Sequence, residues 1–221
     1  MTLLIDNSKY LPQIMEFNEN KSFYLFMALI RAKDYKDGKE PVLKIKEKQE
    51  VLIKTWLVES KESLEHLLPD MLTTVDLFKC RLYMALDRKS FVKSLLSLRD
   101  SVDKYLDSYL FNNNTPYSAK AFNRLLTSAA SVAESSDRET KRWLFDVDSK
   151  ADVNILNDLD KVLEDKLLAK LETKNGYHYV TKKDFDAHRL LGYLKYMYTR
   201  NNIKFPVELK DNALTLVAIG E

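Results

Sequence analysis

The chain has 221 residues, 45% of them hydrophobic, which is enough for one globular domain with a packed core. Its 35 Lys and Arg residues nearly balance its 33 Asp and Glu residues, so nucleic-acid binding would need local basic patches. One cysteine and three histidines exclude an internal disulfide and a cysteine-rich zinc site, and four scattered glycines exclude P-loop and Rossmann phosphate loops.

No apolar run approaches the ~20 residues that span a bilayer. Near the start, Asp6 follows only three apolar residues, which is not the pattern of a signal peptide. We therefore expect a cytoplasmic protein with no membrane partner.

The first half of the chain alternates apolar strands with amphipathic helices. In order, the pattern predicts a strand or short helix over 22–32, a turn at 34–38, a strand over 51–58, a helix capped by Ser60, a strand over 80–86 and a helix over 90–111. Between residues 44 and 54, four lysines are interleaved with Glu47 and Glu50, and we interpret this stretch as solvated. The lysines are Lys44, Lys46, Lys48 and Lys54.

The second half opens with an Asn-rich loop at 112–116, the best candidate for a hinge. The pattern then predicts a helix over 118–133, a strand over 143–148, a helix over 152–166, a strand pair over 168–181, a helix over 185–198 and a strand over 214–219. Mixed strands and helices without an internal repeat predict one α+β or α/β domain.

Asp-x-Asp occurs three times, at 146/148, 158/160 and 184/186. Residues two apart on a helix face different directions, so the pair at 158/160 is expected to be solvated, and the pair at 184/186 belongs to a helix entry. Asp146 and Asp148 lie on a predicted strand, where alternate side chains share a face about 7 Å apart. Two such carboxylates can hold divalent metal ions for phosphoryl transfer, although they can equally mark a strand exit and helix cap.

A tight turn at Asn175-Gly176 precedes His178. A histidine at the start of a strand can hydrogen-bond a triphosphate, beside exposed amides that also favour anions. The alternative is an ordinary hairpin with a surface histidine.

The order of three motifs resembles the archaeo-eukaryotic primase, or primase-polymerase, superfamily. The motifs are Phe145-Asp-Val-Asp148, then Asn175-Gly-Tyr-His178, then Asp211 before the strand at 214–219. The segments 81–90 and 143–148 also resemble small phage proteins of that superfamily. The resemblance implies an α+β fold with an RRM-like catalytic core, in which a mixed or antiparallel sheet is flanked by helices. Within a single domain over 1–221, it implies a core over 51–221 and an N-terminal appendage over 1–50.

The resemblance also implies roles for individual residues. Asp146 and Asp148 would ligate two Mg²⁺ or Mn²⁺ ions, His178 would contact nucleotide phosphates, and Asp211 would complete the metal site, with Glu208 competing for that place. Asn175 stands where the family often has a serine, and no zinc-binding or helical accessory module follows.

Basic residues near these motifs are candidates for binding triphosphate or template phosphate: Arg81, Arg88, Lys89, Lys182 and Lys183, with Tyr83 available for stacking. Their alternative is a solvated surface.

The sequence therefore suggests a metal-dependent nucleotidyl transferase of primase or polymerase type in phage DNA replication, acting in the host cytoplasm. Its expected partners are nucleoside triphosphates, a DNA or RNA template and a helicase or other replication protein. The alternatives are a non-catalytic module that binds nucleic acid or protein through the same fold, and a metal-dependent nuclease using the same carboxylates.

Overall fold

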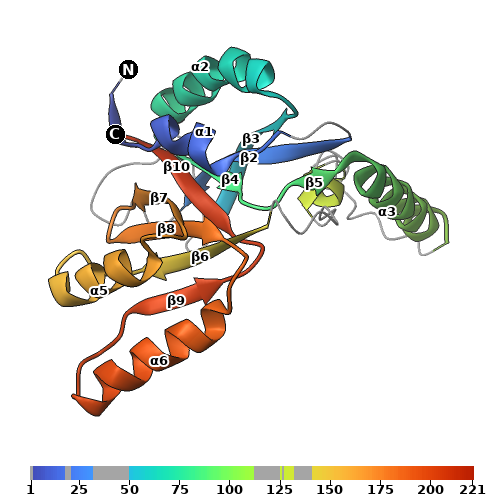
Figure 1. Cartoon of the computed structure of the whole chain (residues 1–221). Coiled ribbons are helices and arrows are strands. Elements are labelled where there is room, and N and C mark those ends of the chain that lie inside the picture. Colours follow the sequence, from blue (N-terminus) through green and yellow to red (C-terminus); the bar gives the residue numbers. More distant parts are fainter. Residues whose placement is uncertain (1, 18–20, 32–49, 112–124, 126, 132–140) are drawn as a thin grey trace.

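The computed structural model describes residues 2–17, 21–31, 50–111, 125, 127–131 and 141–221. Their strands form two antiparallel sheets flanked by helices, so the fold class is α+β (Figure 1). In the described part of the chain, no helix is both long enough and apolar enough to cross a bilayer.

The larger sheet has the strand order β1-β10-β4-β2-β3, and the short β5 pairs with β2. Its strands are β1 (Leu3–Asp6), β2 (Ser22–Arg31), β3 (Glu50–Val58), β4 (Arg81–Ala85), β5 (Lys89–Ser90) and β10 (Leu214–Gly220). Helix α2 (Lys61–Phe78) begins at Ser60, whose hydroxyl accepts a hydrogen bond from the Ser63 N–H at 3.1 Å. Met71 and Val75 of α2 share a core with β2 and β4.

The smaller sheet has the strand order β7-β8-β6-β9. Its strands are β6 (Arg142–Val147), β7 (Leu167–Glu172), β8 (Tyr177–Lys182) and β9 (Val207–Lys210). Helices α5 (Val153–Leu163) and α6 (Ala187–Arg200) pack on the face of β6 that carries Phe145 and Val147. Figure 1 shows α2 beside the larger sheet and α5 and α6 beside the smaller one, with α3 (Phe91–Phe111) projecting to one side.

The two sheets are joined through Asn7, next to the short helices η1 (Ser8–Tyr10) and α1 (Leu11–Ile14). The buried Asn7 amide donates to the carbonyls of Glu172 in β7 (2.9 Å) and Leu216 in β10 (3.2 Å), and accepts from the Glu172 N–H at 3.1 Å. One side chain thereby links β7, an edge strand of the smaller sheet, to β10, which lies between β1 and β4 in the larger sheet. Leu144 and Val180 of the smaller sheet also belong to the core of the larger one.

Most expected elements are confirmed, including the strand alternative for residues 22–32. The N-terminal residues differ from the expected appendage, because β1 pairs with β10 and β2 lies between β4 and β3 inside the larger sheet. The 34–38 turn, the 112–116 loop and most of the 118–133 helix lie outside the described residues, although 125 and 127–131 are helical.

Candidate functional site

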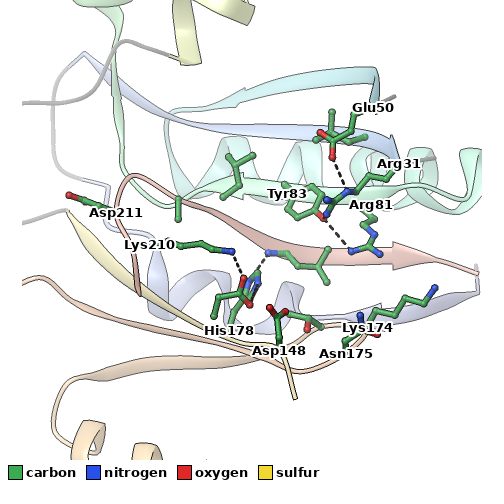
Figure 2. A pocket seen from close by; sticks show the side chains of 16 residues that line it. Arg31, Glu50, Arg81, Tyr83, Asp148, Lys174, Asn175, His178, Lys210 and Asp211 are labelled. Carbon is green, nitrogen blue, oxygen red and sulfur yellow. Dashed lines mark hydrogen bonds and ion pairs between the residues drawn. The ribbon is translucent and has the colours of Figure 1, made fainter. Parts of the chain in front are cut away.

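A cavity of about 930 Å³ opens between the two sheets. From the larger sheet, Arg31, Glu50, Arg81 and Tyr83 line it. The smaller sheet and its loops contribute Asp146, Asp148, Lys174, Asn175, His178 and Lys210. Figure 2 shows Arg31, Glu50 and Tyr83 on one side of β10 and Asp148, Asn175 and His178 on the other, so the cavity has a wall from each sheet.

The two aspartates reach the cavity because successive side chains along β6 point to opposite faces of the smaller sheet. Phe145 and Val147 point into the core with α5 and α6, so Asp146 and Asp148 point the other way. The Asp146 side chain is only 13% exposed, whereas Asp148 lies just past the strand end and is exposed. The alternation therefore predicted the direction of both carboxylates correctly.

Asp146 is held between two positively polarised groups. Its Oδ1 lies 3.4 Å from Nε2 of His178, its cross-strand partner on β8, and its Oδ2 pairs with the ammonium of Lys210 on β9. Burial alone would raise the pKa of Asp146, but the contacts with His178 and Lys210 outweigh burial and lower the pKa to about 2. For Lys210, burial opposes the charged form, but Asp146 raises its pKa. The carboxylate is therefore ionised at neutral pH.

The orientation of His178 is fixed by β10. Its Nδ1 lies 3.1 Å from Oγ1 of Thr215 and 3.4 Å from the backbone nitrogen of Leu216. A backbone N–H can only donate, so Nδ1 accepts and the ring proton is on Nε2, facing Asp146. A bulge in β10 between Leu216 and Ala218 lies next to this contact. His178 is therefore a buried link between the sheets and not a surface residue of an ordinary hairpin.

The β7–β8 turn fits against the end of β6 through Gly176. A Cβ atom there would lie 1.7 Å from the carbonyl oxygen of Val147, so only glycine allows this approach. The Thr173 hydroxyl accepts a hydrogen bond from the Gly176 N–H at 3.0 Å and closes the turn. Lys174 and Asn175 are thereby placed in the cavity wall with Asp148.

The two candidates for a third acidic residue lie in different places. Asp211 borders the cavity but is exposed and pairs with Lys183 at 2.6 Å, and Figure 2 shows it well apart from Asp148. Glu208 lies directly opposite Asp146 in the β6–β9 pairing, with an oxygen 3.8 Å from the Lys210 ammonium. Among the described residues, no three His, Cys, Asp or Glu side chains are grouped closely enough to form a metal cluster.

The other two Asp-x-Asp pairs have structural partners. The Tyr198 hydroxyl donates to Asp158 at 2.6 Å, and Lys170 pairs with Asp160 at 2.8 Å. In the third pair, Asp186 caps α6 by accepting from the Arg189 N–H at 2.9 Å, as expected for a helix entry.

The predicted basic residues are divided between the cavity and other surroundings. Arg81 lines the cavity, with its Nη1 3.4 Å from the Tyr83 hydroxyl oxygen. Arg88 and Lys89 are buried elsewhere, where Arg88 bonds to Ser22 and Lys89 to Asn212 at 3.1 Å. Lys182 is exposed at the end of β8, and neither it nor Lys183 is among the described residues that line the cavity.

Four charged residues of the cavity had no predicted functional role: Arg31, Glu50, Lys174 and Lys210. Lys210 lies in β9, which is too short to show a clear strand pattern. Arg31 ends β2, and the change from an apolar run to a charge was a usable signal. The charge pattern predicts that Glu50 belongs to a solvated stretch, and in the structure its carboxylate lies 2.9 Å from Nε of Arg31.

No family model matches the chain, and neither a curated protein nor a solved structure matches it significantly.

Proposed function

We propose that the chain is a metal-dependent nucleotidyl transferase with an RRM-like core of primase-polymerase type. It would join nucleoside triphosphates on a DNA or RNA template, in phage-type DNA replication in the host cytoplasm and together with a helicase or another replication protein. The observation that carries the proposal is the convergence of three side chains on one cavity whose opposite wall carries arginines. They are Asp146 of β6, Asp148 just past the end of β6, and His178 of β8.

The residues present fit a hard divalent cation. Mg²⁺ usually binds proteins through one or two carboxylates and completes its coordination with substrate phosphates and water, so it needs no three-residue cluster. Asp146 already holds a cationic group, the Lys210 ammonium. Asp146 and Asp148 would therefore hold Mg²⁺ or Mn²⁺, which when bound neutralises phosphate charge and activates the attacking oxygen.

Each neighbouring residue has a separate task in this proposal. His178 orients the Asp146 carboxylate, because its own ring is fixed by β10. Lys210 is 42% exposed and flexible, so its ammonium can move from Asp146 to a substrate phosphate. For a third acidic residue, Glu208 is better placed than Asp211, because it lies directly opposite Asp146 in the β6–β9 pairing, whereas Asp211 pairs with Lys183.

The test is primer synthesis and extension with Mn²⁺ and labelled nucleotides. Asp146→Asn/Asp148→Asn should reduce product by at least about a hundredfold, since changes to metal-ligand partners alone cost about 10–100-fold. The matched control is Asp158→Asn/Asp160→Asn, which has the same spacing and charge change at residues outside the cavity and should keep activity. Undiminished synthesis by the first variant would refute the site.

A nuclease would shorten a labelled primer without added nucleotides, whereas a transferase would lengthen it only with them. Gel electrophoresis of the labelled primer therefore distinguishes the two reactions. If the primer is shortened, and this shortening depends on both aspartates and on Mn²⁺, the proposed reaction is wrong and the site is that of a nuclease.

The contacts of Asp146 with His178 and Lys210 also support a second candidate, a non-catalytic module that binds nucleic acid. Both oxygens of this carboxylate already have partners, so the site is electrically satisfied without a metal. This candidate predicts no Mn²⁺ binding by calorimetry. It also predicts salt-dependent binding of single strands that survives loss of both aspartates.

A further inference from the structure

The wall of the cavity formed by the larger sheet carries a second polar cluster, centred on Tyr83. The Tyr83 oxygen accepts from Nη1 of Arg31 at 3.0 Å and from Nη1 of Arg81 at 3.4 Å. The strand pairing explains this convergence, because Arg81 lies opposite Leu29 and Arg31 follows two residues later on the same face of β2. Two guanidinium groups therefore meet at one phenol (Figure 2).

This cluster is rich in donors. Tyr83 is 8% exposed and Arg81 9%, so both are largely withdrawn from solvent. Two arginines can only donate to the phenol oxygen, so the Tyr83 hydroxyl proton is directed elsewhere, and no acceptor for it is found among the described residues. A buried hydroxyl normally donates to an acceptor, and the Tyr83 hydroxyl borders an open cavity.

Glu50 is the carboxylate that pairs with Arg31 of this cluster. It lies directly opposite Arg31 in the β2–β3 pairing, with Oε1 2.9 Å from Nε of Arg31, and its side chain is 52% exposed. A carboxylate that is half exposed at the cavity edge can leave at small cost, because exposed ion pairs contribute little stability.

We propose that Arg31, Arg81 and Tyr83 form a subsite for a terminal phosphoryl group, and that Glu50 competes with this group for Arg31. Two guanidinium groups match the two charges of a terminal phosphoryl group, and the hydroxyl adds a third donor for its third oxygen. A phosphodiester carries only one charge, so the phosphate end of a free nucleotide fits better than a nucleic-acid backbone. The subsite rests on the proposed function, since it would bind the phosphate end of the nucleotide, which faces away from Asp146 and Asp148.

The experiment is a calorimetric titration of the full chain with inorganic pyrophosphate, in EDTA and at low salt. Arg31→Gln should weaken binding by about tenfold and Tyr83→Phe by several fold, as expected for lost charge-assisted hydrogen bonds. Glu50→Gln should instead tighten binding by several fold, because the competing carboxylate is gone. The matched control is Arg99→Gln, an exposed arginine of α3 paired with Asp100, which should leave the affinity unchanged.

Weaker pyrophosphate binding by Arg31→Gln together with tighter binding by Glu50→Gln is a result that a purely structural ion pair would not give. Succinate serves as the carboxylate probe and should bind at least tenfold more weakly than pyrophosphate. Unchanged pyrophosphate affinity in Arg31→Gln and Tyr83→Phe, with both variants folded by thermal unfolding, would overturn the subsite. Equal affinity for succinate, or weaker pyrophosphate binding by Glu50→Gln, would overturn the assignment of its ligand or of its competitor.

The two proposals can fail separately. Pyrophosphate binding as described, together with synthesis that survives loss of both aspartates, would keep the subsite and reject the proposed reaction. Synthesis that depends on the aspartates without pyrophosphate binding would reject the subsite alone.

Discussion

Gly176→Ala tests whether the β7–β8 turn is packed against β6 as closely as the structure shows. The added Cβ would lie 1.7 Å from the oxygen and 2.8 Å from the carbon of the Val147 carbonyl, whereas ordinary contact begins near 3.4 Å. The obstacle is backbone in a central strand, so the turn has to move by more than an ångström. We expect a loss of about 3 kcal/mol in the free energy of unfolding, the upper part of the range for overpacking.

Urea denaturation followed by circular dichroism measures this loss. With a denaturant slope of about 1–3 kcal/mol per molar, the midpoint should fall by 1 M or more. The matched control is Gly192→Ala in α6, where the new methyl group meets no atom within 4 Å. That change should stabilise the protein by about 0.5–1 kcal/mol, because alanine is the better helix former. An unchanged midpoint in Gly176→Ala would show that the turn does not rest on Val147, and would remove the support for Asn175 in the cavity wall.

Three further predictions concern the sheet junction, the lone cysteine and the acid limb of stability. Asn7→Ala removes three hydrogen bonds of a buried amide and should cost about 2–3 kcal/mol in urea denaturation, whereas an unchanged midpoint would contradict the junction. Burial raises the pKa of the Cys80 thiol to about 12, so a disulfide reagent at pH 8 should label it only after unfolding, and prompt labelling of the folded protein would refute its burial. The folded pKa of Asp146, about 2 against an ordinary 3.8, contributes stability that is present above pH 4 and lost as the pH falls toward 2. Wild type should lose on the order of 2 kcal/mol more than Asp146→Asn between pH 4 and pH 2, and parallel curves would argue against the contacts of Asp146 with His178 and Lys210.

Local patterns predicted most of the fold, because the central strands and long helices have strong periodicity. The helix at Ser60 is an example, since its cap and its apolar spacing agree. The segment 22–31 was ambiguous because an almost continuous apolar run suits a buried strand or a buried helix, and strands on both sides decide the matter. The place of β2 in the sheet depends on contacts with β4, more than fifty residues away, which no local pattern contains.

The candidate site was predictable only where it depends on one element. Alternation along β6 was enough to direct Asp146 and Asp148 to one side. The pairing of Asp146 with Lys210 instead depends on the register between β6 and β9, and β9 has only four residues. In the same way, Arg31 and Glu50 meet because they lie opposite each other in the β2–β3 pairing. The register of that pairing could not be read from the sequence pattern.

The partners of the charged cavity residues differ in how firmly they are held, and this difference bears on the choice between the candidate functions. His178 is fixed by backbone and side-chain atoms of β10, so on this side the Asp146 carboxylate has a rigid partner. Lys210 and Glu50 are charged, partly exposed side chains that each neutralise one cavity residue and can swing into solvent. A permanently closed structural network would bury such groups, because burial makes ion pairs costly to break. Partly exposed counter-charges on both walls are instead what a site needs if a cation binds at Asp146 and an anion at Arg31, which favours a ligand-binding cavity over a purely structural one.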